Sequence, residues 1–221
     1  MTAELVAFDH LIVGVPDLID GCATITRYLG VEPAIGGEHP HLGTANALLS
    51  LGGARYLEIL GPRPGHQAVL PVAATVAVQT APDILTFAMS SQSLVAVAAV
   101  AGALGLVAGA PSPGSRVTPE GDVLQWSSLD LESAIYRGLV PFFIDWQDSA
   151  HPGLTSPPGA GLESLVVAHP EPAGLQAIYD GLGIEIPVRY GNRSAILARI
   201  RAGEKVIELV GSGRGLGMLS V

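Results

Sequence analysis

A threefold internal repeat most constrains what this chain of 221 residues can fold into. The triplet Leu29-Gly30-Val31 recurs as Leu104-Gly105-Leu106 and as Leu182-Gly183-Ile184, each about twenty residues after a short apolar run. Each triplet is followed by a strand-like segment that carries one acid among apolar residues; the three acids are Glu58, Asp145 and Glu208. Repetition in matching context indicates one supersecondary unit used three times.

The repeated segments predict three β-α-β-β-β units, near residues 6–62, 83–148 and 161–211. We therefore expect an α+β fold in which repeated βαβββ units form curled mixed sheets and a half-open barrel around a pocket. The first two units are predicted to form one domain over 1–148. Residues 149–160 are predicted to be a linker, 161–211 a divergent third unit, and 212–221 a mobile tail.

Local signals define the first helix. Asp17 follows Pro16 and is suited to cap a helix from about 18 to 29, and Gly30 stands where a left-handed residue commonly ends a helix. Apolar residues recur at steps of three and four across this segment, as on a helix that packs one face against a sheet.

Composition excludes several classes of function. The formal net charge of −9, without any basic run, argues against a nucleic-acid partner. Leu94–Ala110 contains only Leu, Val, Ala and Gly, but it is rich in Ala and Gly and closed by Pro111, so we expect a helix packed on a sheet and no membrane span. The single cysteine, Cys22, and an N-terminus that does not resemble a secretory signal fit a cytoplasmic protein.

Two motifs carry a resemblance to a known family. Asp9-His10-Leu11 lies in the first predicted strand and Tyr56-Leu57-Glu58 in the fourth, an arrangement that resembles the vicinal oxygen chelate superfamily. The segment Gly36-Gly37-x-His39-Pro40-x-x-Gly43-Thr44-x-Asn46, followed by Tyr56-Leu57-Glu58, resembles more specifically the glyoxalase-like domain family. The match is best over residues 8–60, weaker over 84–146, and beyond 160 rests on the repeat alone.

The resemblance implies a site between paired units, where first and fourth strands supply ligands to one divalent ion. Carried over to this sequence, it offers His10 and Glu58 from the first unit, with Asp145 or Glu208 as a further ligand. His10 and Glu58 could bind Mn²⁺, Fe²⁺, Ni²⁺ or Zn²⁺, and one imidazole with two carboxylates would favour a harder ion over zinc. Only one first-strand His is present, however, so the open alternative is that His10 is hydrogen-bonded in the barrel and Glu58 pairs with Arg55 or a backbone group. No organic cofactor is expected.

The glycine-rich segment beside these motifs contains further candidates. His39 can transfer protons near neutral pH and, with Glu58, is the candidate catalytic pair. Thr44, Asn46 and Trp146 are the candidate substrate-binding residues. The alternatives are that Thr44 and Asn46 cap turns, that His39 is exposed, and that Trp146 belongs to the core. His66, His151 and His169 have Pro or Gly neighbours and are expected in exposed turns.

Three functions remain open from the sequence, of which the third is a dimerising scaffold without a ligand. The first is a lyase or isomerase for a small molecule with neighbouring oxygens, in which a metal ion stabilises an enolate-like intermediate. The alternative is a metal-free protein of the same fold that binds and sequesters a small molecule. An odd number of units leaves one without an internal partner, which favours a homodimer.

Overall fold

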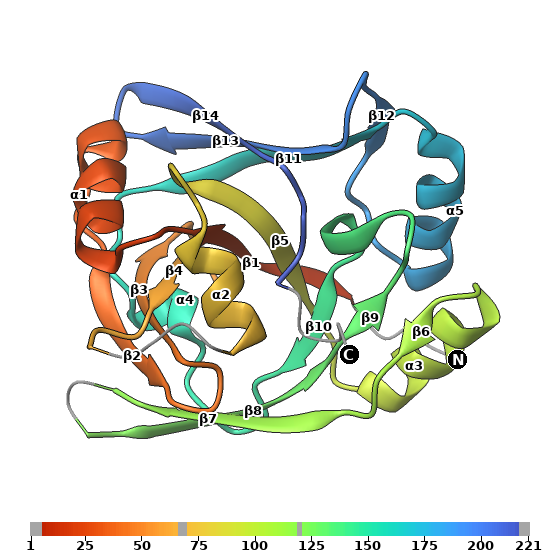
Figure 1. Cartoon of the computed structure of the whole chain (residues 1–221), viewed down its shortest axis with the longest axis horizontal. Coiled ribbons are helices and arrows are strands. Elements are labelled where there is room, and N and C mark those ends of the chain that lie inside the picture. Colours follow the sequence, from red (N-terminus) through yellow and green to blue (C-terminus); the bar gives the residue numbers. More distant parts are fainter. Residues whose placement is uncertain (1–5, 66–69, 119–120, 217–221) are drawn as a thin grey trace.

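The computed structural model describes residues 6–65, 70–118 and 121–216, and it contains two large sheets with helices packed around them (Figure 1). His66, which was expected in an exposed turn, and residues 217–221 of the predicted tail lie outside the described residues.

The first unit consists of β1 (Ala7–Gly14), α1 (Leu18–Leu29), β2 (Ala34–His39), β3 (Thr44–Ser50) and β4 (Tyr56–Pro62). Strand β1 pairs in parallel with β4, so that His10 lies opposite Tyr56, and β3 joins β4 to β2 by antiparallel ladders. The Asp17 side chain accepts a hydrogen bond from the backbone N–H of Asp20, and Gly30 ends α1 with φ of 75°. Both predicted ends of this helix are confirmed.

The second unit repeats this topology. It consists of β5 (Asp83–Ser90), α3 (Leu94–Ala103), β7 (Ser112–Val117), β8 (Val123–Leu129) and β10 (Phe142–Asp145), and β5 pairs in parallel with β10. Smaller elements complete it: β6 (Val107–Ala108), β9 (Leu131–Glu132) and the 3₁₀-helix η1 (Arg137–Leu139). Helix α2 (Pro71–Ala77) connects the two units. No helix among the described residues is long and apolar enough to cross a membrane.

An antiparallel ladder between β1 and β5 joins the two units into one eight-stranded sheet, in the order β2-β3-β4-β1-β5-β10-β8-β7. The sheet curls until its two edge strands meet. Where they meet, the Arg116 side chain on β7 donates a hydrogen bond to the Gly36 carbonyl on β2. The backbones are so close that a Cβ on Gly37 would lie 2.6 Å from the Val117 oxygen. The predicted half-open barrel of βαβββ units is therefore confirmed, and these two units pair within the chain.

The third unit has the expected element order but a different strand order. It consists of β11 (Gly161–His169), α5 (Pro172–Leu182), β12 (Val188–Tyr190), β13 (Ala195–Ala202) and β14 (Lys205–Gly211). Its sheet runs β12-β11-β13-β14, so the first strand lies between the second and third and not beside the fourth. Buried and exposed residues alternate along β13, as in a sheet with one face on the core. This unit therefore forms a cover over the barrel and not a third barrel segment.

The segment between the second and third units packs closely on the first. It contains α4 (Pro152–Thr155), and Ser50 is bonded to it twice, since its N–H donates to the Pro157 oxygen and its hydroxyl to the Gly153 oxygen. The start of the predicted tail is also held, because Gly213 N and Gly215 N donate to the oxygens of Ile84 and Leu85 on β5. Where the described chain covers them, both segments are ordered by backbone hydrogen bonds.

Candidate functional site

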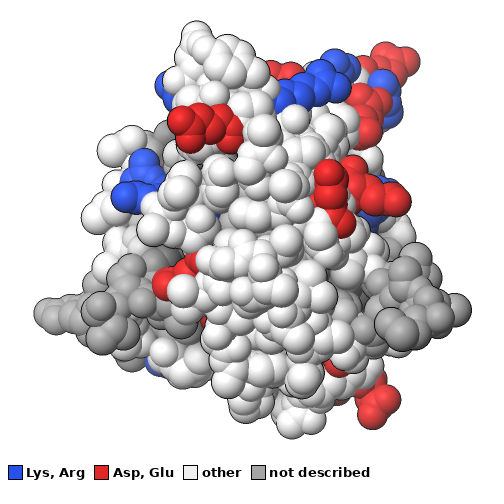
Figure 2. Space-filling model, turned by 90° about the vertical axis from the view of Figure 1, so that its right-hand side faces the viewer, with Lys and Arg blue, Asp and Glu red and all other residues white. Residues whose placement is uncertain are grey.

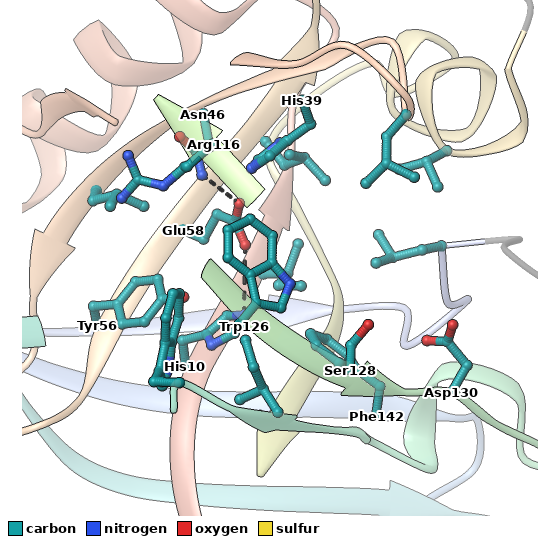
Figure 3. Close-up of a pocket in the computed structure, with 18 residues that line it drawn as sticks. His10, His39, Asn46, Tyr56, Glu58, Arg116, Trp126, Ser128, Asp130 and Phe142 are labelled. Carbon is teal, nitrogen blue, oxygen red and sulfur yellow. Dashed lines mark hydrogen bonds and ion pairs between the residues drawn. The ribbon is translucent and has the colours of Figure 1, made fainter. Parts of the chain in front are cut away.

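The barrel encloses a pocket with about 660 Å³ of empty space, its open mouth included. Most of its lining is apolar, with an aromatic wall formed by Tyr56, Trp126, Phe142 and Trp146. His10, His39, Asn46, Glu58 and Arg116 bring polar atoms to the same space (Figure 3).

A bulge in β1 brings two adjacent side chains together at the base of this site. Neighbouring residues on a regular strand point to opposite faces. Here Phe8 and His10 lie opposite the consecutive residues Met89 and Ala88 of β5, so Asp9 is the extra residue of a bulge. As a result Asp9 Oδ1 lies 2.7 Å from His10 Nδ1.

Asp9 is a buried carboxylate held by three donors. Besides His10, Trp146 Nε1 lies 3.2 Å and His151 Nε2 3.0 Å from its Oδ2 atom. Burial alone would raise the pKa of Asp9, but the hydrogen bonds from His10 and His151 outweigh it and lower this pKa. An ionised Asp9 can only accept, so His10 carries a proton on Nδ1 and turns Nε2 toward the pocket.

Glu58 is fixed between Asn46 and His10. Its Oε1 atom accepts a hydrogen bond of 2.7 Å from Asn46 Nδ2, and its Oε2 atom lies 3.5 Å from His10 Nε2. The His10 ring in turn stacks on Tyr56, with ring centroids 4.4 Å apart. Asp9, His10, Glu58 and Asn46 thus form one connected polar network on the wall of an apolar pocket. Figure 3 shows its contacts between His10, Glu58 and Asn46.

His39 faces the pocket from the end of β2. Its Nδ1 lies 3.2 Å from the Thr44 hydroxyl, which leaves Nε2 as the nitrogen available to a ligand. Burial lowers the pKa of His39, Arg116 and His41 lower it further, and Glu58 acts in the opposite direction. The imidazole is therefore neutral at pH 7 and, through either tautomer, can donate or accept a proton. The alternative of an exposed His39 is wrong, since the residue is 5% exposed.

The predicted site residues do not all come together. His10, His39, Asn46, Glu58 and Trp146 line the pocket, whereas Thr44 contacts it only through His39. Phe142, Ile144 and Trp146 also line it, so Asp145 points to the other face of its strand, where it accepts from the Gln147 N–H. Glu208 is exposed on β14, opposite Arg199 of β13, in the separate sheet.

Several residues at the site were missed by sequence reasoning. Asp9 was noted only as part of a motif, and Arg116 and Asp130 carry no motif at all.

His151 and His169 were expected in exposed turns, and that expectation is wrong. His151 is part-buried against Asp9, and His169 is 8% exposed with its Nδ1 bonded to the Glu171 backbone. A His followed by Pro-Gly can equally begin a short helix, as His151 does for α4.

Two of the four metal ligands predicted from the family resemblance lie close together here. His10 Nε2 and Glu58 Oε2 face each other, and Asp9 on His10 Nδ1 is the outer partner that metal-bound histidines usually have. With Asp145 and Glu208 elsewhere, the described residues contain no group of three His, Cys, Asp or Glu side chains able to hold one ion. A catalytic metal site normally has three protein ligands, so the donor set does not fit one.

Known proteins resemble the chain at the level of the fold. A hypothetical protein from Staphylococcus aureus is 14% identical, with a TM-score of 0.66 over 94% of this chain and 86% of that chain. Methylmalonyl-CoA epimerase from Mycobacterium tuberculosis is 17% identical, with a TM-score of 0.49 over 65% of this chain and 91% of that chain. The comparison with curated proteins found no match.

The paired βαβββ units with a pocket in their curled sheet define the chain as a vicinal oxygen chelate fold. A family model described as the glyoxalase-like domain matches residues 8–183. The protein belongs to the glyoxalase-like domain family, and the resemblance predicted from the sequence motifs is confirmed.

Proposed function

We propose that the protein is a lyase or isomerase that removes a proton from carbon next to a carbonyl group of a small molecule, with Glu58 as the base. The observation that carries this proposal is the fixed position of the Glu58 carboxylate in an apolar pocket, between Asn46 at 2.7 Å and His10 at 3.5 Å. A carboxylate with few surrounding waters is a strong base toward a carbon acid, and its orientation is set before the substrate binds.

His10 and Asp9 support the base. When Glu58 takes a proton, His10 Nε2 can share it, because Nδ1 is already bonded to Asp9. The negative charge of Asp9 stabilises an imidazolium that forms in this way. Asp9 and His10 are therefore positioning residues for Glu58, and the bulge at Asp9 is what allows them to act in series.

His39 acts on the substrate oxygen. Removal of the carbon proton places negative charge on the carbonyl oxygen, and a neutral imidazole can donate its N–H to that oxygen. His39 is neutral because of its burial, and its Nε2 atom is free of the contact with Thr44. The aromatic wall excludes water, which strengthens both interactions.

The second candidate function is metal-free binding of a small molecule without chemistry. The observation that favours it is the aromatic wall, because Tyr56, Trp126, Phe142 and Trp146 would hold an apolar ligand by contact alone. A catalytic readout separates the two functions.

The test is solvent deuterium incorporation, followed by NMR, into a panel of 2-oxo acids, their esters and thioesters. The wild type is expected to exchange the carbon-bound hydrogen next to the carbonyl of at least one compound, and Glu58→Gln to lose about 10³-fold or more of that rate. The matched control is Glu38→Gln, an exposed residue of the same unit, which should retain the rate. Binding without exchange in the wild type would favour the sequestering protein.

A further inference from the structure

A second cavity adjoins the pocket. It holds about 1300 Å³ of empty space, open solvent included, and it lies between β9, η1 and the segment that follows β14. Three residues line both cavities: Asp130, Phe142 and Leu216. Leu216 is placed there by the hydrogen bonds that attach Gly213 and Gly215 to β5. The two cavities are therefore adjacent, with Asp130 at the boundary between them.

Asp130 has a polar atom that nothing in the described chain satisfies. Its backbone oxygen accepts a hydrogen bond from Gly109, but its side-chain Oδ1 is buried without a partner among residues 6–65, 70–118 and 121–216. A buried polar atom of this kind calls for an explanation, and an absent ligand is one. Figure 3 shows the Asp130 carboxyl at the side of the pocket remote from Tyr56 and Arg116, beside Ser128 and Phe142.

The surroundings of Asp130 favour its neutral form. Burial raises the pKa of Asp130, and the nearby Glu132 carboxylate raises it further. The other charged groups that line the second cavity are Arg137 of η1 and Arg214 beyond β14, and both are exposed. A protonated carboxyl presents an O–H donor, which suits an uncharged oxygen acceptor better than a cation.

We propose that Asp130 binds the substrate by donating a hydrogen bond to an uncharged carbonyl oxygen, and that the substrate extends past Phe142 and Leu216 into the second cavity. The substrate class is an enolisable carbonyl compound, a ketone, ester or thioester, with a chain longer than the inner pocket. This inference rests on the proposed function for the place of the reacting carbon, near Glu58. It adds a second contact point and a direction for the rest of the molecule.

The first test needs no substrate. The carboxyl ¹³C resonance of Asp130 is assigned by its loss in Asp130→Asn, and its titration is followed by NMR. Its midpoint should lie above 3.8, the ordinary value for Asp. In Glu132→Gln the midpoint should fall while remaining above 3.8. A wild-type midpoint below the pH of the binding measurements would mean an ionised Asp130 under those conditions and would overturn the proposal.

The second test uses ethyl 2-oxobutanoate, an uncharged ester with neighbouring carbonyl oxygens, and measures Kd from the fluorescence of Trp126 and Trp146. Asp130→Ala should weaken binding about tenfold, the value of one hydrogen bond, and Asp130→Asn should stay within about threefold because its amide still donates. Failure of the wild type to bind, or an unchanged Kd in Asp130→Ala, contradicts the proposal. If Asp130→Ala binds weakly but the wild type exchanges no deuterium, the proposed function fails and the role of Asp130 stands.

A third test addresses the direction in which the alkyl chain of the substrate extends. The hexyl ester of the same acid should bind the wild type more tightly than the ethyl ester, since its extra methylene groups reach the second cavity. Ala134→Trp, at an exposed residue that lines the second cavity and not the inner pocket, places a large side chain in the second cavity and should abolish that gain while it leaves the Kd of the ethyl ester within about twofold. A gain that persists in Ala134→Trp would place the alkyl chain elsewhere and overturn this part of the proposal.

Discussion

Asp9 and His10 are consecutive in the chain, yet their side chains form a hydrogen bond of 2.7 Å in the core of the molecule. The β1 bulge makes this possible, because Asp9 is its extra residue and the regular alternation of side chains between the two faces of the strand is interrupted there. The same carboxylate accepts from Trp146 after β10 and from His151 at the start of α4. One acid thus joins both units of the barrel and the segment that follows them.

Asp9→Ala is expected to be strongly destabilising. The substitution leaves the ring N–H groups of His10, Trp146 and His151 without their acceptor in a site where Asp9 is 1% exposed. We expect a loss of about 3 kcal/mol or more in the free energy of unfolding, measured with urea. Asp148→Asn, on an exposed residue, is the control and should stay within about 0.5 kcal/mol. A small effect of Asp9→Ala would show that this network is not structural.

Much of the fold follows from the sequence because its signals are local. The cap at Asp17, the left-handed Gly30 and the repeated apolar runs each act within a few residues. They define α1 and the unit boundaries without knowledge of the rest of the chain. The motif residues His10 and Glu58 also lie close together, as the family resemblance implies, since both come from one unit with a regular ladder. The hydrogen bond from Asn46 to Glu58 is not part of that prediction.

The rest of the site depends on register and on distant segments. Asp145 and Glu208 are candidate ligands because the family resemblance is carried over to the second and third units. For Asp145, a shift of one position on a strand reverses the face that a side chain takes. For Glu208, the third unit has another strand order. Asp130 and His151 lie 72 and 93 residues beyond Glu58 in the numbering, in segments without periodicity, so no sequence pattern could place them beside it.

Asn46→Leu tests whether the orientation of Glu58 matters for catalysis. The change removes the donor at 2.7 Å from Glu58 Oε1 and keeps a side chain of similar size. We expect kcat for deuterium exchange to fall about 10- to 100-fold with a KM that changes much less, because an orienting contact acts on the transition state. Asn192→Leu, on an exposed residue of the third unit, should change neither. An equal rise in KM with unchanged kcat would assign Asn46 to substrate binding instead.

Gly36→Ala tests the close contact behind Asn46. A Cβ at position 36 would lie 2.4 Å from Asn46 Oδ1, which is too close for two non-bonded atoms. The Asn46 side chain must then shift, which disturbs its hydrogen bond with Glu58, so we expect lower exchange activity, comparable to that of Asn46→Leu, and a loss of about 1–3 kcal/mol of stability. Gly53→Ala is a control for the loss of a glycine, since a Cβ there meets nothing within 4 Å, although φ of 60° adds backbone strain. If Gly36→Ala is fully active, Asn46 does not need its present position.

The burial of His39 makes stability depend on pH in a defined direction. Its pKa in the folded protein is lower than the ordinary 6.5, so below that value the unfolded chain binds a proton that the folded one resists. The free energy of unfolding should therefore decrease as pH falls from about 7 through 6.5 and toward the folded pKa. His39→Gln should remove this part of the pH dependence, whereas His41→Gln, on an exposed residue, should retain it. Identical pH profiles for the wild type and His39→Gln would contradict a buried neutral imidazole.

Metal content distinguishes two readings of the pair His10 and Glu58. A two-ligand site binds divalent ions weakly, and the described residues contain no group of three His, Cys, Asp or Glu side chains that could hold an ion. We therefore expect less than one equivalent of Mn, Fe, Ni or Zn by mass spectrometry after incubation and dialysis, and deuterium exchange that EDTA does not abolish. His10→Ala and Glu58→Ala serve as controls, because an ion bound elsewhere on the chain is retained in both. One equivalent of metal in the wild type, lost in both variants, would instead establish an ion held by these two side chains with ligands from the substrate or solvent, and Glu58 would then be a ligand and not a free base.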